Sequence, residues 1–182
     1  MGTKATVYKA ELEISDIDRS YYATHNVTLA QHPSETDRRL IARLIVFALF
    51  ADERLEFGRG LSTDEDPDLW RRDLTGNIEC WIELGQPDES TMRRACGRAQ
   101  QVILVTYSGN SAGVWWEKNE SSFARSKNLT VVDLDSIEIE SATRFLQRTM
   151  RLQVMIQEGC CQLMNDGETV SVTPRVRMTS NR

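Results

Sequence analysis

The segments DPDLW (residues 66–70) and IECWIELGQ (residues 78–86) decide the fold of this 182-residue chain. Each is a short run of residues that favour β-structure, and Gly76-Asn77, between them, is a turn signal. The simplest structure for this pattern is a β-hairpin. An antiparallel return brings Asp68, where the first strand opens, to the same end of the sheet as Glu83, where the second strand closes.

Two carboxylates held this close repel each other, so the pair is unfavourable unless a proton or a divalent cation neutralises it. Oxygen ligands of this kind suit Mg²⁺ or Mn²⁺. The hairpin therefore predicts a candidate metal site at Asp68 and Glu83. The alternative is that both acids are ordinary strand-end residues that face water.

The length of 182 residues fits one domain, or one domain with a small appended sheet, and the 40% hydrophobic content of the chain is enough for a sizeable core. Its formal net charge of −5 argues against extended phosphate binding, so a contact with DNA or RNA must come from a local basic patch. The four cysteines show neither metal-ligand nor disulfide-framework spacing. Without an apolar stretch of signal-peptide or membrane-span length, we expect a cytoplasmic protein with reduced thiols and no membrane contact.

Residues 34–51 predict a helix with one broad apolar stripe. Ser34 is expected to cap this helix, and Asp37 completes a capping-box-like pattern. Glu35 then lies in the first turn, where the helix dipole alone can account for a carboxylate. A second interpretation is that Glu35 points toward Asp68 and Glu83. The arginines of this helix are expected to form a solvated face: Arg38, Arg39 and Arg43.

Strands and helices alternate over the rest of the chain. Period-two alternation predicts an N-terminal hairpin over residues 6–14 and 21–30, and the polar residues 52–67 predict a loop that forms a lid or rim. A helix at 88–99 and a buried strand at 101–107 follow the central hairpin, as in a right-handed crossover between parallel strands. The elements expected after these are a helix at 117–127, a strand at 129–134, a helix at 136–148 and three β-runs between residues 150 and 173.

The order helix, hairpin, helix, strand, with acids on the first helix and on the hairpin, resembles the PD-(D/E)XK nuclease core. Over nearly its full length the chain resembles, more specifically, the bacterial YaeQ family. The segments that carry this resemblance are KATVYKAEL (4–12), HPSET (32–36), DERLEF (52–57), GLST (60–63), PDLW (67–70), WIELGQPD (81–88) and ACGR (95–98). The resemblance implies one α/β (α+β) domain over residues 1–182. Its three-layer, restriction-endonuclease-like core has a mixed central sheet flanked by helices, with additional N- and C-terminal β-hairpins.

In that superfamily the motif acids hold one or two divalent cations, which polarise a phosphodiester and activate the attacking water. The resemblance therefore implies that Asp68 and Glu83 are catalytic ligands of Mg²⁺ or Mn²⁺, with Glu35 as an accessory ligand or water-positioning group. The superfamily's lysine belongs two places after the glutamate, where this chain has Gly85. The candidates to replace that lysine are Gln86 in a catalytic role and, as contacts to substrate or phosphate, Arg98 and Gln101.

Two functions are compatible with these residues. The first is a Mg²⁺-dependent nuclease or phosphodiesterase that acts on DNA or RNA, and the retained acids favour it. The second is a catalytically degenerate nuclease-like fold that binds a nucleic acid or a protein partner in a regulatory role. The missing lysine and the acidic net charge favour this second function.

Overall fold

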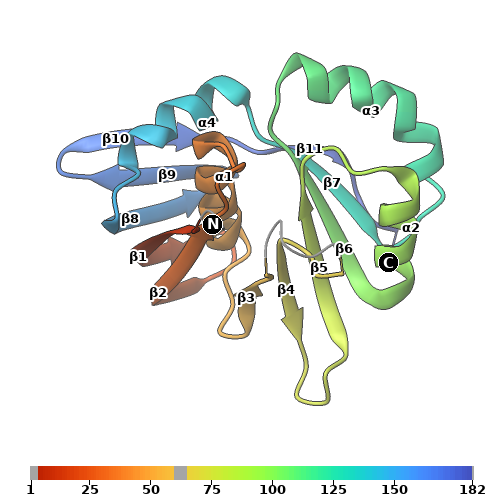
Figure 1. Ribbon diagram of the computed structural model, residues 1–182, viewed down its shortest axis with the longest axis horizontal. Coiled ribbons are helices and arrows are strands. Elements are labelled where there is room, and N and C mark those ends of the chain that lie inside the picture. Colours follow the sequence, from red (N-terminus) through yellow and green to blue (C-terminus); the bar gives the residue numbers. More distant parts are fainter. Residues whose placement is uncertain (1–3, 60–64, 182) are drawn as a thin grey trace.

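The computed structural model describes residues 4–59 and 65–181, which form two mixed β-sheets and four α-helices. Figure 1 shows the layers from left to right: a five-stranded sheet, helix α1 (Asp37–Leu49), a six-stranded sheet, and helices α2 (Glu89–Arg98) and α3 (Asn110–Phe123). Among the described residues, no helix is long and apolar enough to cross a membrane.

The five-stranded sheet joins the two ends of the chain. The predicted N-terminal hairpin is confirmed, because β1 (Thr6–Asp16) pairs antiparallel with β2 (Tyr21–Gln31). The C-terminal strand β8 (Thr149–Gln157) runs parallel to β1, and β9 (Cys160–Asn165) and β10 (Glu168–Val172) extend the sheet beyond it. The predicted additional N- and C-terminal β-hairpins are therefore present, and together they form a second sheet.

The six-stranded sheet contains the central hairpin. Its strands β4 (Leu69–Arg72) and β5 (Ile78–Leu84) are antiparallel, as predicted. The crossover is also confirmed, since α2 connects β5 to the parallel strand β6 (Ala99–Thr106). The remaining strands are β7 (Leu129–Asp133), parallel to β6, and two edge strands that the sequence analysis did not predict, β3 (Leu55–Phe57) and β11 (Arg175–Met178).

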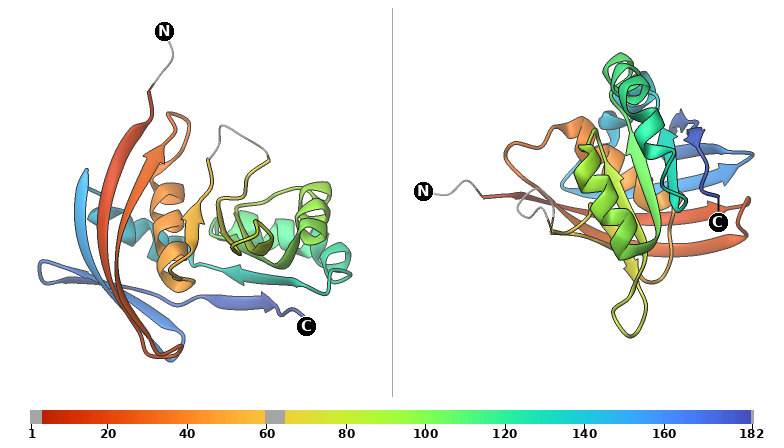
Figure 2. Two further views of the ribbon diagram at one scale, coloured as in Figure 1. Left: turned by 90° about the horizontal axis from the view of Figure 1, so that it is seen from below. Right: turned by 90° about the vertical axis from the view of Figure 1, so that its right-hand side faces the viewer.

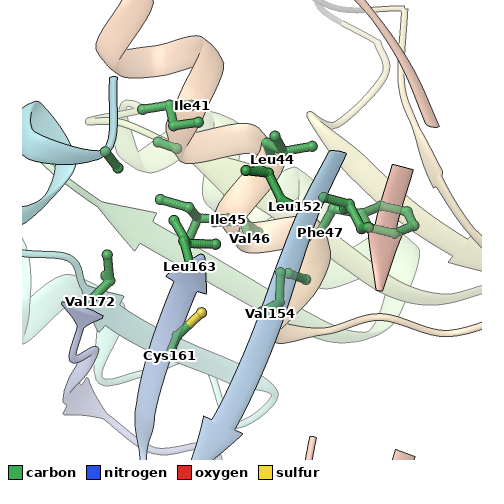
Figure 3. Close-up of a cluster of buried hydrophobic side chains, with 14 of the residues drawn as sticks. Ile41, Leu44, Ile45, Val46, Phe47, Leu152, Val154, Cys161, Leu163 and Val172 are labelled. Atoms are coloured by element: carbon green, nitrogen blue, oxygen red, sulfur yellow. The ribbon is translucent and has the colours of Figure 1, made fainter. Parts of the chain in front are cut away.

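Helix α1 lies between the two sheets and is buried on all sides. Every residue from 40 to 48 is buried, as expected of a helix with a packing layer on each face. Figure 3 shows Ile41 and Ile45 of this helix in one apolar cluster with Leu152 and Leu163 of the five-stranded sheet. This helix therefore holds the two sheets together.

The start of α1 differs from the prediction. Thr36, and not Ser34, is the N-cap, and its side chain accepts a hydrogen bond from the backbone N–H of Arg39. Glu35 therefore precedes the helix and does not lie in its first turn. The solvated arginine face is also wrong in part, because Arg43 is 3% exposed. A helix that packs on both sides has no open face for this arginine.

Three further regions refine the prediction. Helix α3 begins at Asn110, so Trp116 lies inside it and packs against Phe123. Helix α4 (Ser136–Ala142) is shorter than expected and continues as a 3₁₀ turn. All four cysteines are free thiols, as predicted.

Residues 60–64 of the expected lid loop, with the GLST segment, lie outside the described residues.

Ile45→Ala should lower the free energy of unfolding by about 2–5 kcal/mol, because it opens a cavity between two layers that cannot both collapse into it. The comparison is Ile137→Ala in α4, where the side chain is 76% exposed and the cost should stay within about 0.5 kcal/mol. Urea denaturation followed by circular dichroism measures both. Equal losses of unfolding free energy in the two variants would contradict the central position of α1.

Candidate functional site

Asp68 and Glu83 lie together at one end of the central hairpin. Asp68 directly precedes β4, and its backbone N–H donates to the carbonyl of Ile82 at 3.1 Å. Its Oδ2 accepts a hydrogen bond of 2.7 Å from the backbone N–H of Leu84, the residue after Glu83. Two contacts with the neighbouring strand therefore fix the position of the Asp68 carboxylate beside Glu83.

Glu83 is an acid whose charge is disfavoured. Burial, and then the nearby Asp68 carboxylate, raise the pKa of Glu83 to about 7. The indole N–H of Trp81 donates to Glu83 Oε1 at 3.0 Å and, with Arg39, opposes the shift. Near neutral pH the charged form of Glu83 is therefore disfavoured, and a protonated Glu83 carboxyl can donate a hydrogen bond to Asp68.

Glu35 lies in the turn between β2 and α1 and is buried, with 7% of its surface exposed. Both of its carboxylate oxygens are occupied by Arg43, whose Nε lies 2.9 Å from Oε2 and whose Nη2 lies 2.7 Å from Oε1. Arg39 adds a third contact, from Nη1 to Oε2 at 2.9 Å. This geometry is a bidentate charge pair inside the protein, which explains why the acid is buried.

Arg39 connects Glu35 to Asp68. Its Nη2 lies 2.5 Å from Asp68 Oδ1, so one guanidinium binds carboxylates from two parts of the fold. Burial opposes the charge of Arg39, but Asp68 and Glu35 more than compensate and raise its pKa above the ordinary value. Burial and the same two acids raise the pKa of Tyr107, which follows β6 and faces this group. The site is thus a continuous chain of charges: Arg43, Glu35, Arg39, Asp68 and Glu83.

The three predicted replacements for the lysine do not join this chain of charges directly. Gln86 is exposed and donates its amide to the hydroxyl of Ser111 at 3.1 Å. Gln101 in β6 pairs with Cys80, which lies three residues before Glu83 in β5. Side chains alternate along a strand, so the Gln101 side chain lies on the face of the sheet opposite to Glu83. Arg98 comes nearest, since its guanidinium lies 5.0 Å from the centre of the Trp81 ring, whose N–H binds Glu83.

The sequence analysis missed Arg39 and Arg43 as partners of the site. Both lie at helical spacing from Glu35, four and eight residues later. Side chains at such spacing share one face of a helix and its preceding turn, so the spacing was a usable signal. The helix pattern alone predicts a solvated face there, because the sheet that covers it is assembled from distant parts of the chain.

The comparisons with known proteins agree over nearly the whole length of the chain. A family model described as "YaeQ protein" matches residues 1–174. The chain belongs to the YaeQ family. It is 42% identical over 172 residues to "Uncharacterized protein YaeQ" of Escherichia coli (strain K12), covering 94% of this chain and 95% of the relative. The protein of the same name from Salmonella typhi is 42% identical over 163 residues, covering 90% of each chain.

Two solved YaeQ structures have the same fold. The crystal structure of the YaeQ protein from Xanthomonas axonopodis pv. citri superposes with a TM-score of 0.93 at 54% identity, covering 96% of this chain and 99% of that one. The YaeQ protein from Pseudomonas syringae superposes with a TM-score of 0.92 at 31% identity, covering 98% of both chains. The two-sheet architecture is therefore shared by YaeQ proteins of different sequence.

The carboxyls of this YaeQ protein fit a divalent cation to different extents. Asp68 and Glu83 supply oxygen atoms of the type that Mg²⁺ and Mn²⁺ bind, and they lie side by side. Glu35 does not fit, because its oxygens are held by Arg39 and Arg43. Among the described residues, no three or more His, Cys, Asp or Glu side chains are grouped to hold a metal ion.

Arg43→Met should lower the free energy of unfolding by about 3–5 kcal/mol, because Glu35 stays buried without its bidentate partner. Arg38→Met is the matched control on the same helix. Arg38 pairs with Glu140 at the surface, where both side chains are more than half exposed, so its loss should cost at most about 1 kcal/mol. Chemical denaturation at neutral pH measures both variants. A small cost for Arg43→Met would show that Glu35 reaches water or another donor.

Glu83→Gln should make the protein more stable at alkaline pH. The pKa of Glu83 is higher in the folded state than in the unfolded state. At pH values between these two pKa values the folded state binds more protons than the unfolded state, so stability falls as the pH rises through this range. Between about pH 5 and pH 8, wild type should lose about 1–3 kcal/mol relative to Glu83→Gln. Denaturation at a series of pH values, with a chelator present to remove metal ions, tests this prediction. Parallel pH profiles for the two proteins would contradict the raised pKa.

Proposed function

We propose that the chain is a divalent-metal-dependent nuclease or phosphodiesterase of the PD-(D/E)XK type, acting on DNA or RNA in the cytoplasm. The observation that carries the proposal is the Asp68–Glu83 pair. The two carboxyls lie side by side at the end of the central hairpin, and burial, together with the Asp68 charge, raises the pKa of Glu83. A divalent cation would relieve the repulsion between the two charges.

The chemistry that such a cation supplies when bound is polarisation of a phosphodiester and a lower pKa for the attacking water. The protein's own contribution is to hold the two carboxyls. The backbone N–H of Leu84 fixes Asp68, and the indole N–H of Trp81 fixes Glu83. In this proposal Glu35 is not a ligand but a positioning group, since it orients Arg39.

Arg39 is the cation that we assign to the role of the absent lysine. Gly85 cannot neutralise charge on a phosphate, but the guanidinium of Arg39 already lies at the Asp68 carboxylate. Its side chain is 14% exposed, so it reaches the surface of the site. A guanidinium forms paired hydrogen bonds to phosphate oxygens and stabilises charge that develops there.

A second candidate function is a catalytically degenerate nuclease-like fold that binds a nucleic acid or a protein partner. The observation that favours it is that Arg39 occupies the space between Glu35 and Asp68 and balances their charges. Arg43 and Arg39 pair with Glu35 and Asp68, so this part of the site needs no metal ion for neutrality.

Calorimetric titration with Mg²⁺ and Mn²⁺ separates the two functions when it is combined with cleavage assays on mixed DNA and RNA substrates. Wild type should bind the cations and cleave, whereas the double variant Asp68→Asn/Glu83→Gln should lose at least about tenfold in cation affinity and lose cleavage. Arg39→Met should still bind the cations and lose cleavage, because it removes the charge that we assign to the phosphate and leaves the carboxylates of Asp68 and Glu83 in place.

The matched control is Glu79→Gln, four residues earlier in β5, where the carboxylate pairs with Arg54 and Arg71 at the surface. It should bind cations and cleave as wild type does. If wild type neither binds the cations nor cleaves, the metal-dependent activity is refuted and the binding function stands. Retention of DNA or RNA in a mobility-shift assay without cleavage would then identify the ligand class.

A further inference from the structure

The strand β2 is the long, uncharged edge of the five-stranded sheet. It has 11 residues, YYATHNVTLAQ, with no Asp, Glu, Lys, Arg or Pro. Burial lowers the pKa of His25, so this side chain is neutral at pH 7. The two views of Figure 2 show β1 and β2 as long neighbouring strands, of which β2 is the edge strand of the sheet.

The other sheet edges in the described part of the chain are protected in the usual ways. β3 has three residues, β10 carries Glu168, and β11 carries Arg175 and Arg177 within four residues. Short length and charged side chains prevent an edge from pairing with another chain. β2 has neither protection, although charged residues make up 27% of the sequence.

The backbone of β2 offers a row of free hydrogen-bonding groups. The backbone N–H of Lys9 donates to the carbonyl oxygen of Arg148, directly before β8. The backbone N–H and C=O groups of odd-numbered β1 residues therefore point toward β8, and those of even-numbered residues point toward β2. In the β1–β2 register, even positions of β1 lie opposite odd positions of β2. The residues of β2 that turn their N–H and C=O groups outward are therefore Tyr22, Thr24, Asn26, Thr28 and Ala30.

One of these outward groups is already used. Arg43 donates from Nη2 to the carbonyl oxygen of Ala30 at 3.0 Å, which ends the open edge on that side. The open row thus runs from Tyr22 to Thr28 and is centred on His25. An antiparallel strand of the same sequence, related by a two-fold axis at His25, places Tyr22 opposite Thr28 and Thr24 opposite Asn26.

These opposed pairs are compatible with one another. An aromatic residue beside a β-branched residue is a favourable cross-strand pair, and Thr and Asn can form a hydrogen bond. The chain carries a net charge of −5, so two copies repel each other wherever acidic surfaces meet. Contact through β2 brings no charged side chain of that strand against its symmetry mate.

We propose that β2 is the interface of a homodimer, in which two copies pair antiparallel through Tyr22, Thr24, Asn26 and Thr28. The two five-stranded sheets then form one continuous sheet of ten strands. The partner is a second copy of this chain because the open edge is self-complementary about its centre and uncharged. The inference is independent of the proposed nuclease activity.

Sedimentation and light scattering over about 1–100 μM protein test the dimer. Wild type should have twice the mass of the chain. Asn26→Pro removes only an N–H that faces outward, since proline is compatible with an open edge, and it should raise the dissociation constant at least about tenfold. Thr24→Lys should do the same by placing two lysines near the axis, and it covers the case in which the proline variant fails to fold.

The matched control is Gln153→Lys in β8, which is exposed on the same open face but lies inside the sheet. It should remain dimeric. A monomeric wild type over this concentration range would overturn the proposal. So would a dimer that survives Asn26→Pro and Thr24→Lys but is lost in Gln153→Lys, because the interface would then be the sheet face. Thermal unfolding of each variant confirms that a monomer is folded.

Discussion

The buried ion pair between Glu35 and Arg43 constrains the rest of the structure. Removing two charges from water is expensive, and the pair is tolerated only because its geometry is bidentate. Arg43 also binds the carbonyl of Ala30 in β2, and Arg39, one turn earlier, binds Asp68. A shift or rotation of α1 would leave several buried charges without partners. One helix therefore sets the position of both sheets.

This constraint also shapes the candidate site. Asp68 receives its contacts from two directions, a guanidinium from α1 and a backbone N–H from β5. The position of the Asp68–Glu83 pair is consequently tied to packing around α1, some of it in the five-stranded sheet. The apolar cluster that holds α1 and the charges at its start are thus parts of one arrangement. The packing fixes the helix, and the helix fixes the carboxyls.

The elements that could be predicted from the sequence are those with local signals. Gly76-Asn77 marked the central hairpin, and the apolar run before Tyr107 marked the buried strand β6. The parallel pairing of β1 with β8 has no local signal, because it joins segments more than a hundred residues apart. The burial of Arg43 depends on how the two sheets pack around α1. Without the second sheet, its position on the helix indicates solvent, and Ser34 and Thr36 are equally suitable caps.

The backbone at Gly85 explains why a lysine is disfavoured two positions after Glu83. Gly85 has a φ of +106° and donates its N–H to the carbonyl of Val105, so the chain turns away directly after β5. A Cβ there would meet no atom within 4 Å, which leaves the backbone conformation as the obstacle. A lysine at this position would cost about 1–3 kcal/mol of strain. The positive charge beside Asp68 comes instead from another element, because α1 supplies Arg39 to this carboxylate.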